Sequence, residues 1–272
     1  MKIHRWLIST FAAASALCGA HPALADNDFG GSSGCGGLPN WSTLRAALKQ
    51  AVSDETSGLD FQMWATLVSR DGTVCAVAFS GDDFTDQWLG SRVISAQKAN
   101  TAVDFSLNNK STSTVFPSGL ALSTANLYSA TQPGGSLYGL QASNPVSADA
   151  AYAGSSSRFG GPNDPMVGNR IGGVNVFGGG FALYRGGKNV GGVGVSGDTS
   201  CADHDIGWRV RHNLGFDQLK GVGGVSGDPQ RPDNIVYDIK PNPNGGTGIS
   251  AGGFGHPTCI RTGDQTALPP VH

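Results

Sequence analysis

The strongest constraint on the fold is a pair of apolar, β-forming segments, residues 61–69 and 73–79, joined by Arg70, Asp71 and Gly72. An Asp-Gly pair between two such segments favours a tight turn, because both residue types tolerate a positive φ angle. The sequence therefore predicts a β-hairpin, and with it an antiparallel sheet that has to bury at least one face.

A second pair of β-forming segments lies at residues 181–184 and 190–195, on either side of the turn-forming stretch 185–189. By the same argument this pair predicts a second hairpin. A shorter β-forming run at residues 235–239 adds one more strand, so we expect about five strands in all.

Three segments show the apolar spacing of amphipathic helices, at residues 41–56, 91–107 and 202–214. The first repeats at i, i+3, i+4, i+7 and i+8 through Leu44, Ala47, Leu48, Ala51 and Val52. A short helix is expected at residues 122–128. Helices that alternate with hairpins predict an α+β fold, in which one antiparallel β-sheet of about five strands is packed by helices and carries Gly-rich irregular extensions.

The second hairpin is rich in glycine, and Gly192, Gly194 and Gly197 match G-x-G-x-x-G, the phosphate-binding pattern of dinucleotide-binding proteins. That pattern has to follow a strand within a parallel βαβ unit, whereas these glycines lie inside an antiparallel hairpin. We therefore interpret them as a strand that packs closely against another element, where side chains would not fit.

Residues 1–25 have the pattern of a secretory signal, with basic residues at the start, an apolar centre and small residues before a cleavage point after Ala25. The alternative is a membrane anchor. The apolar stretch is interrupted by Cys18-Gly19 and His21-Pro22 and is short for a bilayer. We therefore expect a periplasmic or secreted protein without stable membrane insertion.

Composition divides the remaining chain into three parts. Residues 26–40 are rich in glycine and serine at their start and predict a flexible tether. Residues 41–217 hold the predicted helices and hairpins, interrupted at about 111–170 by a long polar insertion. Residues 218–272 are rich in glycine and proline and predict an irregular C-terminal extension.

Four cysteines follow the predicted signal, and an even number favours disulfides in an oxidising compartment. They allow three pairings. We favour Cys35–Cys75 and Cys201–Cys259, because each joins a core segment to a flanking tail. The second bond would pin the C-terminal extension to the domain. The sequence contains no C-x-x-C motif, so it does not indicate a zinc knuckle or a thiol-redox site.

The charge balance argues against one class of partner. The chain carries 18 Lys and Arg against 20 Asp and Glu, a formal net charge of -2, and the basic residues form no run. Nucleic-acid binding depends on clustered Lys and Arg that neutralise phosphates. We therefore expect no nucleic-acid partner.

Two histidines lie near the cysteines of the second favoured disulfide, with His204 shortly after Cys201 and His256 shortly before Cys259. If these cysteines pair, their Cα atoms lie about 5.5 Å apart, which draws both imidazoles into one neighbourhood. Imidazole is a common ligand of transition metals and of haem iron. One hypothesis is a metal or haem-iron site at His204 and His256; the alternative is two ordinary polar residues beside a disulfide.

Three separated segments carry a resemblance to a known family. They are the hairpin with its following loop (68–82), the helix segment Ile-Ser-Ala-Gln-Lys-Ala-Asn-Thr-Ala (94–102), and a Gly-rich block (178–203) that contains Val-Gly-Gly-Val-Gly-Val-Ser-Gly and ends at an Asp. In this order they resemble the GlcG/HbpS-type haem-binding (haem-degrading) family over about residues 41–216, apart from the insertion. Phe181 departs from that pattern, since the family often has a proline-containing turn there.

The resemblance implies haem as cofactor and five candidate pocket residues, Lys98, Thr101, Ser196, Gly197 and Asp203. Lys98 would pair with a haem propionate through charge-assisted hydrogen bonds, or else be a solvated helix lysine. Ser196 and Gly197 would present backbone N–H groups to a carboxylate at the start of the last helix, or else form a plain helix-entry turn. Iron ligation varies within the family, so the resemblance supplies no iron ligand.

The function implied is an exported protein that binds haem or a related tetrapyrrole and takes part in haem handling or sensing. A homo-oligomer and a sensor or transport partner are compatible with the resemblance. One alternative is an extracytoplasmic enzyme that degrades haem; the sequence leaves enzyme status open, because no residue set clearly supplies catalysis. Another is a non-haem structural or interaction module, in which aromatic residues serve packing or a partner surface: Tyr128, Tyr138, Tyr152, Phe159 and Phe177.

Overall fold

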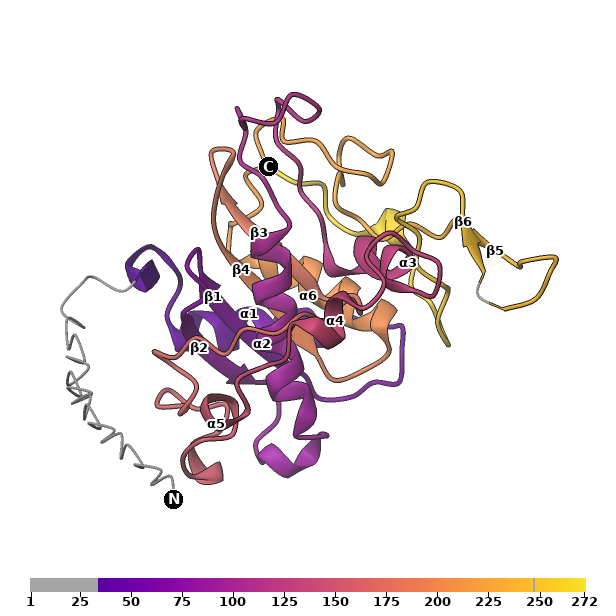
Figure 1. The fold of residues 1–272 in the computed structure, drawn as a ribbon. Coiled ribbons are helices and arrows are strands. Elements are labelled where there is room, and N and C mark those ends of the chain that lie inside the picture. The colour runs from indigo at the N-terminus through magenta and orange to yellow at the C-terminus, as the bar shows by residue number, and fades with distance from the viewer. Residues whose placement is uncertain (1–33, 247) are drawn as a thin grey trace, which may run out of the picture. The chain divides into compact units, whose positions relative to one another are not determined.

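The computed structural model describes residues 34–246 and 248–272 (Figure 1). The predicted signal and most of the glycine- and serine-rich part of the predicted tether, residues 1–33, lie outside this range. The described residues belong to one compact unit of the chain, residues 32–272.

The central sheet is antiparallel, with the strand order β2-β1-β4-β3 (Figure 1). The first hairpin comprises β1 (Trp64–Ser69) and β2 (Val74–Phe79), and the second comprises β3 (Gly180–Arg185) and β4 (Lys188–Ser196). Both predicted hairpins are confirmed. Gly72 takes a φ of 80° at the first turn, where a residue with a Cβ would be strained. The hairpins are joined by antiparallel pairing of β1 with β4.

Two helices cover one face of this sheet, α1 (Trp41–Ser53) and α6 (Ser200–Asn213). Each begins at a polar cap, since the side chain of Asn40 accepts a hydrogen bond from the N–H of Thr43 and that of Thr199 from the N–H of Ala202. The apolar stripe expected in the first helix is buried against the sheet through Leu44, Ala47, Leu48 and Ala51. Burying such a side chain is worth about 1.5–3 kcal/mol for the larger members.

The opposite face is covered by α2 (Gly90–Asp104), which packs against β4. The glycines of β4 permit this approach. A Cβ on Gly194 would lie 1.9 Å from the carbonyl oxygen of Ser95, and one on Gly192 would lie 2.4 Å from that of Ala99. The interpretation of these glycines as a closely packed strand is therefore confirmed, and α2 is embedded instead of lying exposed on the sheet.

The predicted insertion contains turns and short helices. A buried ion pair ties it to α2: Arg92 Nε donates to Asp164 Oδ2 at 2.9 Å, and both side chains are fully buried. The short helix expected at 122–128 is present as η3 and the start of α3. The short helices in this part of the chain are η3 (Thr124–Leu127), α3 (Tyr128–Thr131), α4 (Leu140–Ser143), α5 (Ala148–Ala151) and η4 (Ser156–Arg158). A further 3-10 helix, η2 (Phe84–Asp86), lies between β2 and α2.

The C-terminal residues form a second, two-stranded ladder of β5 (Ile239–Lys240) and β6 (Ile249–Ser250), and a late 3-10 turn, η5 (Gln265–Ala267). The strand expected at 235–239 thus contributes only its last residue, and it does so outside the central sheet. The α+β class with an antiparallel sheet packed by helices is confirmed.

Both favoured disulfides are present. Cys35, in the 3-10 helix η1 (Gly34–Gly37), pairs with Cys75 of β2, with Cα atoms 5.4 Å apart. Cys201, in the first turn of α6, pairs with Cys259 at a Cα separation of 5.9 Å. The second bond attaches the C-terminal residues to the start of α6.

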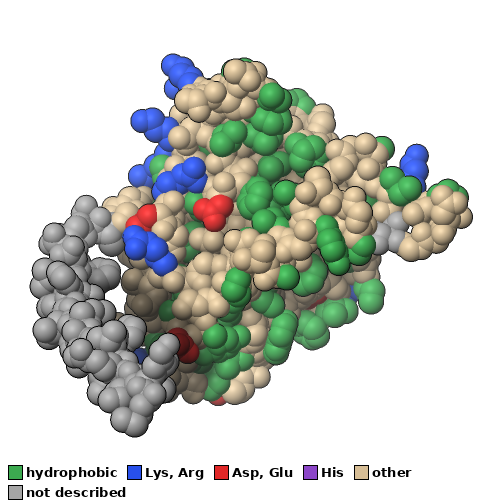
Figure 2. All heavy atoms as spheres, viewed as in Figure 1, with side chains coloured by type: hydrophobic (Ala, Val, Ile, Leu, Met, Phe, Trp, Pro, Cys, Tyr) green, Lys and Arg blue, Asp and Glu red, His purple; other side chains and the backbone are tan. Residues whose placement is uncertain are grey.

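Figure 2 shows one face of the molecule, on which Lys and Arg side chains gather mainly to one side while hydrophobic side chains are scattered across the rest. Of the aromatic residues considered for a partner surface, Tyr138, Tyr152 and Phe177 are exposed, whereas Tyr128 and Phe159 are partly buried. No helix within the described ranges is long and apolar enough to cross a membrane.

Candidate functional site at the start of helix α6

A buried ion pair joins α2 to the start of α6. Lys98 Nζ donates to Asp203 Oδ2 at 2.6 Å and to the carbonyl oxygen of Val195 at 2.9 Å. The Lys98 side chain has no exposed surface and that of Asp203 is 4% exposed. The ammonium therefore links α2, β4 and α6 inside the protein, and it does not face solvent.

The second oxygen of Asp203 completes this arrangement. Asp203 Oδ1 accepts hydrogen bonds from the backbone N–H groups of Gly197, at 3.1 Å, and Asp198, at 2.8 Å. The backbone N–H groups at this helix entry, those of Gly197 and Asp198, thus bind a carboxylate of the chain itself, whereas the resemblance implied the N–H groups of Ser196 and Gly197 and a ligand carboxylate. Burial raises the pKa of Asp203 to about 6, and the opposite charge of Lys98 limits this rise.

The remaining candidate pocket residues lie apart from this pair. Thr101, one turn further along α2 and fully buried, donates from Oγ1 to the carbonyl oxygen of Gln97 and accepts from the N–H of Asn175 at 3.0 Å. It therefore fixes the chain that leads into β3. Ser196 is the last residue of β4, buried opposite Trp64.

His256 lies beside the first turn of α6. Its Nδ1 is 2.7 Å from the carbonyl oxygen of Pro257, and its Nε2 is 2.7 Å from Ser200 Oγ. A carbonyl oxygen only accepts, so Nδ1 carries the proton in the neutral ring and the lone pair of Nε2 faces the Ser200 hydroxyl. Ser200 Oγ also accepts from the N–H of Gly178 at 2.7 Å.

His204 lies on α6, one turn beyond Ser200, and is fully buried. The N–H of Ile235 donates to its Nε2 at 3.1 Å, and Asn234 Oδ1 lies 3.0 Å from the same nitrogen. Its Nδ1 has no hydrogen-bond partner among the described residues. The ring packs 4.7 Å from the ring of Phe181, centroid to centroid.

Both imidazoles are neutral at physiological pH. Burial lowers the pKa of His204 to about 3 and that of His256 to about 4, because desolvation disfavours the charged ring. The neutral ring is the form that binds metals and haem iron. The two histidines that the disulfide argument placed in one neighbourhood therefore both lie near the start of α6, and both are in the neutral form that can bind a metal.

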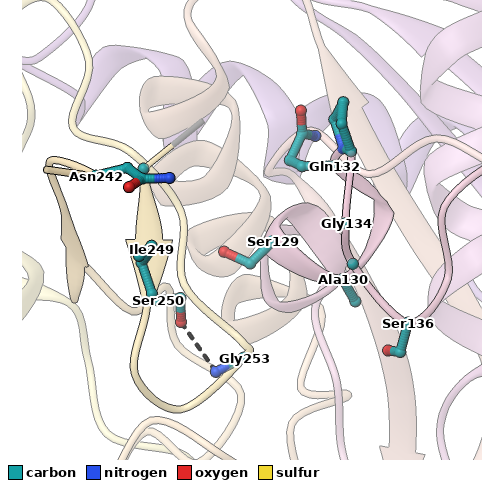
Figure 3. A pocket seen from close by; sticks show the side chains of 12 residues that line it. Ser129, Ala130, Gln132, Gly134, Ser136, Asn242, Ile249, Ser250 and Gly253 are labelled. Atoms are coloured by element: carbon teal, nitrogen blue, oxygen red, sulfur yellow. Dashed lines mark hydrogen bonds between the residues drawn. The ribbon is translucent and has the colours of Figure 1, made fainter. Parts of the chain in front are cut away.

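A groove lies between the α3 region and the β5–β6 ladder (Figure 3), and neither His256 nor Ser200 is among its lining residues. Its volume is about 290 Å³, and Figure 3 shows Ser129, Gln132, Asn242 and Ser250 among its lining residues. The groove adjoins His256 along the chain, since Ser129 Oγ donates to the carbonyl oxygen of Gly255 at 2.6 Å. Tyr128, which precedes Ser129 in the sequence, has its ring centroid 4.8 Å from that of His256.

Sequence reasoning missed three partners of the histidines, Ser200, Asn234 and Pro257. Only Ser200 had a local signal, because it lies next to Cys201 and just before the helix predicted at residues 202–214, which begins at Ser200 in the structure. Asn234 and Pro257 are in the irregular extension, where no periodic pattern places a side chain.

The fold and the buried cluster define a class of protein: an antiparallel sheet with a helix embedded on a glycine-rich strand, held to the last helix by a buried Lys–Asp pair. The chain belongs to the HbpS-like family, described as haem degrading protein HbpS-like, whose model matches residues 41–210.

Other comparisons are more distant. No curated protein matches the chain significantly. Among solved structures it is similar to PduOC in a complex with haem, at 24% identity and a TM-score of 0.41, over 64% of this chain and 90% of that chain. It is also similar to the Klebsiella pneumoniae protein ORFY, at 20% identity and a TM-score of 0.41, over 65% of this chain and 90% of that one.

Proposed function

We propose that this chain binds haem or a related tetrapyrrole and takes part in haem handling or sensing outside the cytoplasm. The match of residues 41–210 to the haem-degrading family carries this proposal. The extracytoplasmic location is supported by the signal pattern of residues 1–25 and by the two disulfides, which persist in oxidising compartments. A homo-oligomer and a sensor or transport partner are further expectations of the family resemblance.

The donor set at the start of α6 fits an iron ligand, and of the two histidines His256 fits better. A ligating histidine usually donates its second ring N–H to a carbonyl or carboxylate, which orients the ring. His256 already does so to Pro257, and only the Ser200 hydroxyl has to turn away to free Nε2. His204 is the second candidate: its Nδ1 has no hydrogen-bond partner among the described residues, but the residue has no exposed surface. Haem held here would supply the redox and oxygen chemistry of its iron.

The motif residues then act as positioning residues. Because Lys98 and Asp203 neutralise each other in the interior, we propose that they fix the start of α6, and with it Ser200 and His256, and do not touch a propionate. Gly197 contributes through its backbone N–H, while Ser196 and Thr101 hold β4 and the entry to β3.

We propose the groove of Figure 3 as the approach to His256, which does not line the groove but lies behind Tyr128 and Gly255, so Tyr128 would have to move for a ligand to reach the ring. Its volume is at the lower end of the range of ligand pockets, so it would take one edge of a tetrapyrrole and leave the rest outside. Hydroxyl and amide groups line it, and these would face the polar edge of the ligand.

A haem titration of the protein, read by visible absorption, tests the proposal. Wild type is expected to give a saturable, red-shifted Soret band. His256→Ala should weaken binding roughly tenfold or more and change the spectrum, because the residue proposed to ligate the iron is removed. His212→Ala, a matched change at the other end of α6, should leave both unaltered. A wild-type protein that does not saturate at micromolar haem would overturn haem binding and favour the non-haem module. Unchanged binding in both His256→Ala and His204→Ala would retain haem binding but reject this site.

Degradation of bound haem is the second candidate, favoured by the description of the family as haem degrading. Under peroxide or reductant, loss of the Soret band with iron release, faster than for free haem, would support it. A stable spectrum under the same conditions would support haem binding without degradation.

A further inference from the structure

A second cluster of metal-ligating side chains lies at the C-terminal end of α6. It comprises His212 in the last turn of the helix, Asp217 just beyond it, and His272. The Nδ1 of His212 is 2.7 Å from Asp217 Oδ2, and the Nδ1 of His272 is 2.6 Å from Asp217 Oδ1. The two imidazole rings are stacked, with centroids 4.8 Å apart and planes 10° from parallel.

The burial of Asp217 makes this cluster unusual. Its side chain is 1% exposed, yet the carboxylate oxygens accept hydrogen bonds only from the two imidazoles among the described residues. Its backbone carbonyl also accepts from the N–H of His272 at 3.2 Å. Buried carboxylates are normally paired with a cation or coordinate a metal. The imidazoles are more open, with 28% and 58% of the side chains of His212 and His272 exposed. The carboxylate is thus anchored inside while its two partners line an accessible edge.

We propose that His212, Asp217 and His272 form a binding site for a divalent first-row transition metal of the zinc class. Two imidazole nitrogens and one carboxylate oxygen are a common ligand set for such ions, with the remaining positions left to water or another ligand. All three ligand atoms lie within 4.8 Å of one another. Ligands on a tetrahedral zinc are about 3.3 Å apart, so binding requires the two present N···O distances, 2.7 and 2.6 Å, to lengthen by roughly 0.6–0.7 Å.

The site is separate from the proposed haem function. His212, Asp217 and His272 all lie beyond residues 41–210, the stretch that matches the family. The other group of potential ligands in the described chain, Cys201, His256 and Cys259, has both sulfur atoms in a disulfide. Metal binding at the C-terminal end of α6 would connect the helix, the loop after it and residue 272 through one ion.

The test is a calorimetric titration of the full-length, haem-free protein with Zn²⁺, and with Mg²⁺ as the hard-cation control. Wild type is expected to bind one Zn²⁺ more than His272→Gln, or to bind it at least ten times more tightly, and to ignore Mg²⁺. His4 and His21 are present in both proteins, so any metal they bind cancels. His212→Gln should reproduce the loss.

Equal stoichiometry and affinity in wild type and both variants would overturn the site and leave the cluster as a hydrogen-bonded attachment of His272. Circular dichroism checks that His272→Gln is folded, which is expected because this ring is more than half exposed. Haem titration of the same variants separates the two proposals, since neither change should affect the Soret band.

Discussion

The two ends of helix α6 use similar residue types in opposite ways. At its start, Lys98 and Asp203 form an ion pair with almost no exposed surface, and His256 is held between Ser200 and a backbone carbonyl. At its C-terminal end, one buried carboxylate, Asp217, is paired with two imidazoles that solvent reaches.

The difference shows that burial determines whether a polar group can change its partner. A group whose partners all lie inside the protein can be replaced only at the cost of an unpaired buried charge. A group at an accessible edge can exchange a hydrogen bond for a metal ion without disturbing the core. On this comparison, changes to the Lys98–Asp203 pair should mainly affect stability, and changes to the imidazoles at the C-terminal end of α6 should mainly affect metal binding.

The largest effect is expected from Lys98→Met. It leaves the Asp203 carboxylate buried without its cation, which should lower the free energy of unfolding by about 3–5 kcal/mol. Urea denaturation followed by circular dichroism measures this. Because Lys98→Met/Asp203→Leu removes both charges, the double variant should recover part of the loss.

A matched surface pair provides the control. Arg45 and Asp82 lie 3.4 Å apart, with 30% and 95% of their side chains exposed. Asp82→Asn should therefore give no measurable change. A loss from Lys98→Met as small as that from Asp82→Asn would mean that the buried pair does not hold α2 to α6.

The next effect concerns pH. Burial lowers the pKa of His256 to about 4, below the value of 6.5 for an exposed ring. The unfolded chain therefore takes up the proton first as the pH falls, and this residue reduces stability progressively between about pH 6.5 and 4. When the pH is lowered from 7 to 5, the free energy of unfolding should fall by up to about 2 kcal/mol more in wild type than in His256→Gln, as measured by urea denaturation.

Comparison with His256→Gln is needed because other groups act in the opposite direction. Burial raises the pKa of Asp203 to about 6 and of Asp205 to about 7, so each binds its proton more readily in the folded state and favours folding as the pH falls. Both carboxyls are present in the two proteins, so their contributions cancel in the difference. Parallel pH curves for wild type and variant would show that His256 is not held in its neutral form.

Much of the fold could be predicted from sequence because its signals are local. Asp71-Gly72 marks a turn, the apolar spacing of residues 41–56 marks a helix, and the glycines of β4 mark a close approach. The attachment of the insertion could not be predicted, since Arg92 and Asp164 are far apart in the sequence and no periodic pattern links them.

The candidate site was predicted in part. The disulfide argument drew His204 and His256 to one region, and the family resemblance singled out Lys98 and Asp203. Neither argument predicted that Lys98 is buried, because the exposure of its side chain depends on how closely α2 packs against β4. The cluster of His212, Asp217 and His272 carried no signal, since residue 272 reaches the helix only through the folded path of an irregular tail.

The smallest expected effect would sharpen the contrast between the two ends of α6. Without metal, His272→Gln removes a half-exposed partner of Asp217 while His212 remains, so the free energy of unfolding should fall by less than about 1 kcal/mol. With Zn²⁺ at about 100 times its dissociation constant, wild type should gain about 2.7 kcal/mol and the variant much less, because only the folded protein assembles the three ligands. Urea denaturation with EDTA and with Zn²⁺ measures both quantities. Equal gains in the two proteins would place the bound metal elsewhere, whereas a large metal-free loss would show that this end of α6, like its start, relies on its polar groups for stability.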